Sequence, residues 1–571
     1  MNCNLVYELG AEFGEYAVKA PHLHEYAHKA RSNSEFEGIP LQFKKSLSQD
    51  LRLLKKFNLI YPVSDNIFIH VFKGARDAYG RYCPIESRLP PDKKNLIGKA
   101  EELIASIINE EIAQKIVEKR EKILIELFEA VVKIEGSSTS PSKNKTRIAP
   151  LFLPKETYEQ LKYEILTDKI GMGPLEPMIK DVYIEDISCD GIGPVFLEHK
   201  IFGSMTTTIE FKNESELDSF IVKMCERIGR PVSPRRPIVD ASLLDGSRLN
   251  VVFGNDVSRR GSNFTIRKFT KIPLSITQLV KFGTLDARMA AYIWMMLESG
   301  MSIFICGETA SGKTTTLNAI TVFIRPDAKV ITIEETPEVY IPHPNWVSEC
   351  SRSGESEASS IELFDLLKSA LRQRPNYIIV GEIRSKEGNV AFQAIQTGHP
   401  VISTFHAASM QKLIQRITGD PINIPAAYID NLNVVLFQSS VKSPKTGKFE
   451  RRVTSICEII GIDPVEKSYN FIEIFSWDPI TDAHTFRGVG NSYLLEYKVA
   501  PMKGLAPKDA RKIYNELELR TYIIKKLIEL NIFNYYDVYN ALSKIHENPY
   551  LADMTFDNYT TKAIDKILKS D

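Results

Sequence analysis

The segment Gly307-Glu-Thr-Ala-Ser-Gly-Lys-Thr314 constrains the fold of this chain more than any other part of its sequence. It matches the phosphate-binding loop pattern G-x-x-x-x-G-K-[ST] at every fixed position. The apolar run at residues 302–306 predicts a buried strand before the loop, and residues 315–322 predict a helix after it. This order of strand, loop and helix is typical of parallel α/β sheets, which makes a chance match in a glycine turn a poor alternative.

The loop predicts a site for the phosphates of a nucleotide. Its glycines let backbone N–H groups point at phosphate oxygens, and the N-terminus of the following helix adds a favourable dipole. We expect Lys313 to contact the β- and γ-phosphates and the Thr314 hydroxyl to bind Mg²⁺. The full set of residues predicted to bind the nucleotide is Gly307, Glu308, Thr309, Ala310, Ser311, Gly312, Lys313, Thr314 and Thr315.

Two apolar runs downstream of the loop end in acidic residues. Residues 329–333 lead into Glu334 and Glu335, and residues 376–381 lead into Glu382. In a doubly wound sheet such strand ends converge on the bound ligand. We expect Glu382 to contribute to the magnesium site, and either Glu334 or Glu335 to polarise the attacking water. Taken singly, each acid is better explained as an ordinary solvated strand end, but the two together favour a site.

Two histidines and a group of arginines are further candidates. His399 and His406 lie in the segments Thr-Gly-His-Pro and Thr-Phe-His-Ala. They lack a cysteine or a third histidine at ligand spacing, which argues against a metal site, so γ-phosphate sensing and plain packing both stay open. Arginines in the region before the loop are either charge clamps on the phosphates or an ordinary basic face. They are Arg248, Arg259, Arg260 and Arg267.

Composition narrows the classes of function. The 571 residues include 72 Lys and Arg and 72 Asp and Glu, and zero net charge argues against a general nucleic-acid clamp. The seven cysteines form no C-x-x-C, which argues against a zinc knuckle and predicts a reducing compartment. The N-terminus lacks the features of a signal peptide, and the longest apolar stretch, near residues 289–297, is far shorter than the ~20 residues of a spanning helix. We therefore expect a soluble, cytoplasmic protein.

Shifts in pattern divide the chain into six parts. Residues 92–134 show helical periodicity, whereas residues 135–145 have the composition of a flexible linker. Strands and helices alternate from about residue 283 to 440, as in a parallel sheet with crossover helices. The predicted parts are a variable N-terminal region at 1–134, a linker at 135–149, an α/β domain at 150–268, a hinge at 269–282, an α/β core with a C-terminal β extension at 283–510, and a helical C-terminus at 511–571.

Four blocks in this order resemble the secretion-ATPase superfamily, which drives type II secretion, type IV pili and type IV secretion. They are the phosphate loop at 307–314, an acidic box at 332–338, the segment 371–384 and a histidine box at 396–407. Residues 171–181 and 184–187 are similar to the start of the family's N-terminal domain, so the resemblance covers about residues 150–510. The segments that are similar to the archaeal branch, and within it to the archaellum (archaeal flagellum) ATPase, are 239–250, 259–269 and 531–538.

The resemblance implies a RecA-like P-loop core preceded by a PAS-like α/β domain. It also implies a homohexamer that binds ATP and Mg²⁺ between the two domains of one subunit, where arginines of the N-terminal domain close the site. Arg248, Arg260 and Arg267 match those positions. The implied partners are a polytopic membrane platform protein and other cytoplasmic motor components, which would hold the ring at the cytoplasmic face of the cell membrane. No stable nucleic-acid partner is expected.

The resemblance also bears on the reacting residues. It favours Glu334 as the residue that polarises water, although Glu334-Glu335 replaces the family's usual Glu-Asp and leaves the choice between the two carboxylates open. It favours catalytic roles for His399 and His406, and it places Glu382 on the magnesium side. We therefore expect an ATP hydrolase that couples hydrolysis to domain motion and so drives the assembly or rotation of an archaeal pilus-like filament. The favoured filament is the archaellum. The alternatives are an archaeal pilus or secretion ATPase, a nucleic-acid motor, and a nucleotide-binding switch that scarcely hydrolyses.

Overall fold

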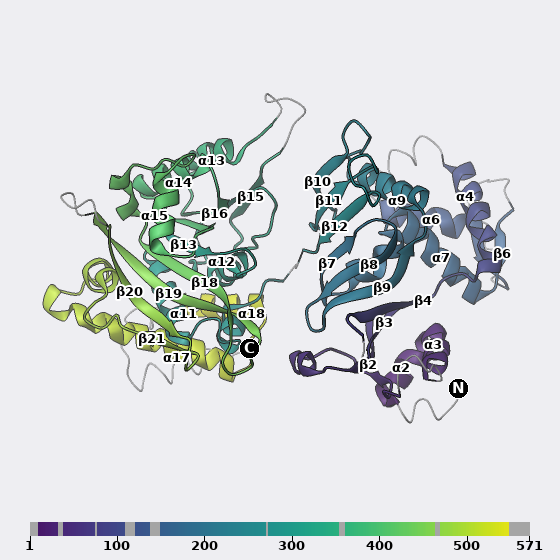
Figure 1. Cartoon of the computed structure of the whole chain (residues 1–571), viewed down its shortest axis with the longest axis horizontal. Coiled ribbons are helices and arrows are strands. Elements are labelled where there is room, and N and C mark those ends of the chain that lie inside the picture. The colour runs from purple at the N-terminus through teal and green to yellow at the C-terminus, as the bar shows by residue number, and fades with distance from the viewer. Residues whose placement is uncertain are drawn as a thin grey trace. The chain divides into compact units, whose positions relative to one another are not determined.

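The chain forms two compact units, Met1–Phe269 and Thr270–Asp571 (Figure 1). Each unit contains one large sheet with helices packed against it. The computed structural model describes residues 9–31, 38–74, 77–108, 120–136, 149–269, 272–352, 360–462 and 469–546. The division between the units falls at the start of the predicted hinge at 269–282.

The first unit is built on a ten-stranded sheet. In spatial order its strands are β1 Gln42–Phe43, β2 Phe57–Ser64, β3 Ile67–Lys73, β4 Gly80–Glu86, β9 Gly203–Phe211, β8 Gly193–His199, β7 Ile184–Cys189, β12 Asn263–Arg267, β11 Arg248–Val252 and β10 Ile238–Ser242. Neighbours run antiparallel except β1 with β2 and β4 with β9. Because β4 pairs with β9, the strands of the predicted N-terminal region and those of the predicted domain at 150–268 share one sheet.

Helices cover both faces of this sheet. The helices of this unit are α2 Ala11–Lys19, α3 Pro21–Arg31, α4 Asn95–Ile107, α6 Arg120–Val131, α7 Lys155–Lys169, α8 Glu176–Lys180 and α9 Glu214–Arg227, with short turns η2 Gln49–Leu53, η3 Pro91–Lys93 and η4 Gly173–Leu175. Strand β2 shows why two layers form: Ile60 packs with α2 and α3, whereas Leu59 and Tyr61 pack on the opposite face with α8 and α9. The remaining helices α4, α6 and α7 form a separate cluster with the strand pair β5 Val132–Ile134 and β6 Leu151–Leu153. Most of the predicted linker, residues 137–148, lies outside the described residues.

The second unit is built on a nine-stranded sheet. In spatial order its strands are β15 Trp346–Cys350, β14 Val330–Glu334, β16 Tyr377–Ile383, β17 Val401–Phe405, β13 Ile303–Gly307, β18 Val434–Lys442, β19 Phe449–Ile462, β20 Tyr469–Asp478 and β21 Ala483–Phe486. The first six run parallel and the last three continue the sheet in antiparallel order. The predicted α/β core with an antiparallel extension is therefore confirmed, and it is preceded by an α/β domain as expected.

Both faces of the parallel part are buried beneath helices, which explains the continuous apolar runs of its strands. One face packs with α13 Leu363–Leu371, α14 Glu387–Gln396 and α15 Met410–Thr418. The other packs with α10 Ile276–Lys281, α11 Ala287–Glu298, α12 Lys313–Ile320, α17 Ile513–Glu529 and α18 Tyr535–His546. Shorter helical segments are η5 Thr321–Phe323, η7 Ala426–Asn431, η8 Leu494–Val499, α16 Ala500–Met502 and η9 Pro507–Lys512.

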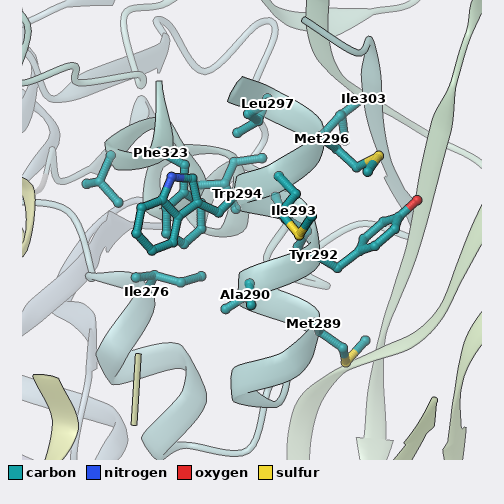
Figure 2. Packing of buried hydrophobic residues seen from close by; sticks show 14 of the residues in the cluster. Ile276, Met289, Ala290, Tyr292, Ile293, Trp294, Met296, Leu297, Ile303 and Phe323 are labelled. Carbon is teal, nitrogen blue, oxygen red and sulfur yellow. The ribbon is translucent and has the colours of Figure 1, made fainter. Parts of the chain in front are cut away.

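Residues 289–297 of helix α11 (Ala287–Glu298) lie inside the core and are apolar on all sides. Residues 289–297 are all buried, and the Trp294 ring stacks on Phe323 with 5.6 Å between the ring centroids (Figure 2). A helix with no polar face packs in a protein interior, so the longest apolar stretch of the sequence is accounted for by the core. Within the described ranges, none of the helices combines the length and the hydropathy of a membrane span.

Most of the described part of the predicted hinge is a capped helix. Ser275 caps α10 with a capping box, and its hydroxyl also donates to the Phe533 carbonyl at 2.7 Å. Thr277 donates to the Ile532 carbonyl at 2.8 Å. Residues 275–282 are therefore fastened to the second unit. The described part of the predicted helical C-terminus contains α17 and α18, and residues 547–571 lie outside the described residues.

Candidate active site

The phosphate loop connects β13 to α12 at the carboxyl edge of the parallel strands. Two of its glycine positions are enforced by their surroundings. A Cβ atom on Gly307 would lie 2.2 Å from the Gln438 carbonyl oxygen, and Gly312 has a left-handed φ of 94°. Ala310 also has positive φ, at 60°. The loop therefore wraps tightly in front of the N-terminus of α12, as the sequence pattern predicts.

Polar groups of the loop are held in place for a ligand. The Lys313 ammonium donates to the Glu308 carbonyl at 2.9 Å, which keeps its side chain folded over the loop. Burial lowers the pKa of Lys313, while the Glu382 carboxylate acts in the opposite direction. The Ser311 hydroxyl is buried and, among the described residues, has no hydrogen-bond partner. An unpaired buried hydroxyl is costly, and a phosphate oxygen bound in the loop would supply a partner.

The neighbouring strands bring four further groups to this edge. Strands β14, β16, β17 and β13 run parallel, so their carboxyl ends lie at one edge of the sheet. Glu334, Glu382 and His406 therefore lie at the same edge as the phosphate loop. His406 Nε2 lies 2.6 Å from Glu382 Oε1. Arg384 Nη2 lies 2.5 Å from Glu382 Oε2. The result is a cluster of four ionisable side chains, Lys313, Glu382, Arg384 and His406.

A β-bulge directs Glu382 towards this cluster. The pairing of β16 with β17 changes register between Val380 and Glu382. The Thr404 hydroxyl donates to the Gly381 carbonyl at 2.7 Å and stabilises the bulge. A Cβ atom on Gly381 would lie 3.0 Å from Glu334 Cγ, so glycine leaves room for the neighbouring acid. Bulges commonly re-aim a side chain beside an active site.

Glu334 and Glu335 occupy very different environments. Glu334 is 3% exposed, and its Oε1 accepts from the backbone N–H groups of Glu338 at 2.9 Å and Val339 at 3.0 Å. Its Oε2 is buried without a partner among the described residues. Burial raises the pKa of Glu334 to about 8, and the two backbone N–H groups only partly oppose this. Glu335 is exposed and lies 3.6 Å from Arg384.

The two predicted histidines lie at opposite ends of β17. His406 directly follows the strand at the carboxyl edge, where burial lowers its pKa and the Glu382 carboxylate opposes the shift. His399 lies two residues before the strand begins, and its Nδ1 is 3.1 Å from the Thr397 hydroxyl oxygen. A five-residue strand is about 16 Å long. Within this unit the structure brings His406 to the phosphate loop but does not bring His399 there.

The predicted arginine clamps belong to the other unit. Arg248 on β11 lies opposite Arg267 on β12, and Arg248 Nη2 is 2.7 Å from the Asp240 carboxylate. Arg260 is exposed, and its carbonyl oxygen would lie 2.2 Å from a Cβ atom on Gly191. All three precede Phe269, whereas the phosphate loop lies in the unit that starts at Thr270. Their contact with nucleotide stays a prediction.

The predicted magnesium ligands offer a suitable donor set. Thr314 lies in the first turn of α12 and supplies a hydroxyl oxygen, and Glu382 supplies a carboxylate. Mg²⁺ is usually held by one or two carboxylates together with phosphate oxygens, so these residues fit that ion. In the part of the chain that the structure describes, no group of three or more His, Cys, Asp or Glu side chains is arranged to hold a metal by itself.

Sequence reasoning missed three residues of the site. Arg384 lies two positions after Glu382 and directly after the end of β16, where its guanidinium reaches the Glu382 carboxylate. Gln438 on β18 accepts from the Thr316 hydroxyl at 2.8 Å. Arg451 Nε on β19 donates to the Ala310 carbonyl at 3.2 Å. The last two come from strands more than 100 residues beyond the loop, and no local pattern marks them.

Comparison with known proteins identifies the family. Residues 168–450 match the family described as type II/IV secretion system protein. An uncharacterized protein of Methanocaldococcus jannaschii is 46% identical over 550 residues, which cover 94% of this chain and 97% of that protein. The type IV secretion system protein VirB11 of Bartonella henselae is 27% identical over 221 residues, which cover 33% of this chain and 62% of that protein.

Among solved structures, the pilus retraction motor PilT with bound ADP is 20% identical, with 53% of this chain and 83% of that chain covered and a TM-score of 0.38. Because this TM-score is low, the strand order and the phosphate loop of this chain define its fold. The nearly full-length similarity to a Methanocaldococcus protein agrees with the predicted archaeal branch. The chain belongs to the type II/IV secretion system protein family, and it is a P-loop ATP hydrolase of that family.

Proposed function

We propose that this chain is the magnesium-dependent motor ATPase of an archaeal type IV pilus-like filament, most specifically the archaellum. The observation that carries the proposal is the gathering of Lys313, Glu382 and His406 at the carboxyl edge beside a complete phosphate loop. A phosphate loop by itself only binds nucleotide. Charged groups beside it, together with the buried carboxyl of Glu334, supply what hydrolysis needs.

The residues divide into binding and reacting groups. The loop N–H groups and Lys313 bind the phosphates, and Thr314 and Glu382 hold Mg²⁺, which neutralises charge on the β- and γ-phosphates. Glu334 orients the attacking water and accepts its proton, because burial has raised the pKa of its carboxyl into the range of a general base. His406 is held against Glu382 and contacts the γ-phosphate side of the site.

The proposed motor is a homohexamer. Arg248, Arg260 and Arg267 of the first unit close the nucleotide site, and hydrolysis changes the position of one unit against the other across the predicted hinge at 269–282. The ring acts at the cytoplasmic face of the membrane through a polytopic platform protein and other cytoplasmic motor components. The support for this part is the resemblance of the sequence blocks to archaeal members of the family, together with the boundary between two compact units.

Two alternatives have specific support. An archaeal pilus or secretion ATPase shares every feature of the site, and the VirB11 similarity is to a protein named for type IV secretion. A nucleic-acid motor is the other: a putative conjugal transfer protein of Mycobacterium tuberculosis is 27% identical over 240 residues, which cover 41% of this chain and 68% of that protein. Zero net charge favours the filament motor, because a processive nucleic-acid motor needs a basic track.

Assembly and specificity can be tested together. Light scattering after size exclusion should show a species of six times the 64.6 kDa chain mass when a non-hydrolysable ATP analogue is present. Single-stranded DNA at low salt should leave the ATPase rate unchanged. In the source organism, replacement by the Lys313→Ala variant should remove one class of surface filament seen by electron microscopy. Loss of swimming assigns the archaellum, loss of adhesion filaments alone assigns the pilus, and activation by DNA contradicts the proposal.

A further inference from the structure

Strand β19 carries two adjacent arginines that point to opposite sides of the sheet extension. Arg451 is exposed, whereas Arg452 is 4% exposed. Successive side chains of a strand alternate in this way. The two side chains are chemically identical, but their surroundings differ. We therefore expect them to have different roles.

Arg452 fastens β19 in position. Its guanidinium forms two hydrogen bonds with the Asp482 carboxylate, at 2.8 and 3.0 Å, and a third with Glu450 at 2.5 Å. It also donates to the Phe282 carbonyl at the end of α10, at 3.3 Å. The neighbouring backbone N–H of Val453 donates to the Thr284 carbonyl at 2.7 Å. All the charge of Arg452 is thus satisfied within the protein, and the strand is tied to the first helix of the second unit.

Arg451 lies against the phosphate loop. Its Nε donates to the Ala310 carbonyl at 3.2 Å, and its Cδ would lie 3.0 Å from a Cβ atom on Gly312. The aliphatic stem therefore packs on the loop backbone, and the guanidinium stands at the surface of the loop. Among the described residues it makes no ion pair, and Nη1 and Nη2 form no hydrogen bonds.

We propose that Arg451 is a nucleotide-phosphate contact of this site, supplied by the β extension of the same subunit. The Nη1 and Nη2 groups of Arg451 lie beside the phosphate loop. A guanidinium in this position can donate two parallel hydrogen bonds to the oxygens of a phosphate group. The loop also contains the unpartnered Ser311 hydroxyl, a second sign that an oxygen-rich ligand completes it. Arg452 is the positioning residue that holds the strand. This inference rests on the proposed function, because it names a further residue of the same ATP site.

The test compares charge with shape at position 451. Binding of fluorescent ADP and ATP analogues should weaken about tenfold or more in Arg451→Gln, because a charge-assisted contact is lost. Arg451→Lys keeps the charge but loses the bidentate fork and the Nε bond to Ala310, so its binding should fall between that of the wild type and that of Arg451→Gln. Arg487→Gln is the matched control, since it removes an exposed arginine after β21 whose nearest acid, Glu473, is 3.7 Å away. It should bind as the wild type does.

Two outcomes overturn the proposal. One is nucleotide binding by Arg451→Gln within twofold of the wild type. The other is equal weakening in the Gln and Lys variants, which would assign Arg451 to holding the loop rather than to the phosphates. Loss of a ground-state contact in the variants should also raise KM for ATP more than it lowers kcat. Should the Gln variant unfold, the Lys variant and the KM measurement still decide. Failure of the wild type itself to bind nucleotide would instead refute the proposed function.

Discussion

The buried carboxyl of Glu334 predicts a specific pH dependence of catalysis. Burial raises its pKa to about 8 from an ordinary value of 4.5. A carboxyl with this pKa is about one-tenth ionised at pH 7 and about half ionised at pH 8. As general base it acts only when ionised, so kcat/KM for ATP should rise about tenfold per pH unit from pH 6 to near pH 8 and then level off. Burial lowers the pKa of His406 from its ordinary value, against the opposing effect of the Glu382 carboxylate.

The assay is steady-state hydrolysis at saturating Mg²⁺ between pH 6 and 9.5, compared for the wild type, Glu334→Gln and Glu335→Gln. Glu334→Gln should lose about 10²- to 10⁴-fold in kcat. Glu335→Gln should keep the wild-type profile, because its carboxylate is exposed and separate from the buried site. A flat wild-type profile between pH 6 and 8, or near-normal turnover by Glu334→Gln, would refute the assignment.

Stability should change with pH in the opposite direction to activity. The folded carboxyl of Glu334 holds its proton up to about pH 8, whereas the unfolded one releases it near 4.5. Stability is therefore unaffected below about pH 4.5 and falls as pH rises through this window, by about 3 kcal/mol at pH 7. Glu334→Gln stays neutral, so its melting temperature should equal that of the wild type at pH 5 and exceed it at pH 8. Equal melting temperatures at pH 8 would show that the carboxyl titrates normally.

Three further substitutions test the fold and the site. Gly307→Ala should abolish nucleotide binding, because its Cβ would lie 2.2 Å from the Gln438 carbonyl oxygen. Gly98→Ala in α4 has open space around the added Cβ and should leave binding unchanged. Calorimetric titration with ADP compares the two variants. Trp294→Ala should destabilise the second unit by about 3–5 kcal/mol, because the ring is fully buried between Phe323 and Arg520, and chemical denaturation measures this. His406→Ala should lower kcat at least tenfold through loss of its contact with Glu382, whereas His399→Ala should keep near-normal basal turnover. Equal loss in both histidine variants would show that His399 acts in the site after all.

The loop and the strand ends were predictable because the relevant physics is local. Each strand of the core is a short apolar run followed at once by a loop or an acid, so Lys313 and Glu382 could be assigned to one edge from sequence alone. The choice between Glu334 and Glu335 could not, because it depends on which of two adjacent side chains turns inward at the end of β14. His399 and His406 lie in similar sequence segments, so the sequence does not tell them apart. They lie at opposite ends of β17, and only His406 is therefore at the edge of the sheet that holds the phosphate loop.

Long-range pairings account for the rest. The parallel pairing of β4 with β9 joins residues more than 120 positions apart, and nothing in either strand indicates its partner. Gln438 reaches the loop from β18, the last parallel strand, and Arg451 from the antiparallel β19, which the sequence predicts only as part of a C-terminal β extension. The contacts of α10 inside the predicted hinge are also long-range. The residues that fasten α10, Ser275 and Thr277, bond to carbonyls more than 250 positions later.

The most direct test of the account is the steady-state ATPase rate of the wild type and of Lys313→Ala, with and without magnesium. We predict turnover that requires magnesium and that falls at least a hundredfold in the variant, with unchanged melting temperature. Lys313 reaches the Glu308 carbonyl and contributes little to the core, so loss of activity without loss of folding would point to the phosphates. Turnover that persists in Lys313→Ala, or a wild type that binds ATP without hydrolysing it, would contradict the assignment of this loop as the site of ATP hydrolysis.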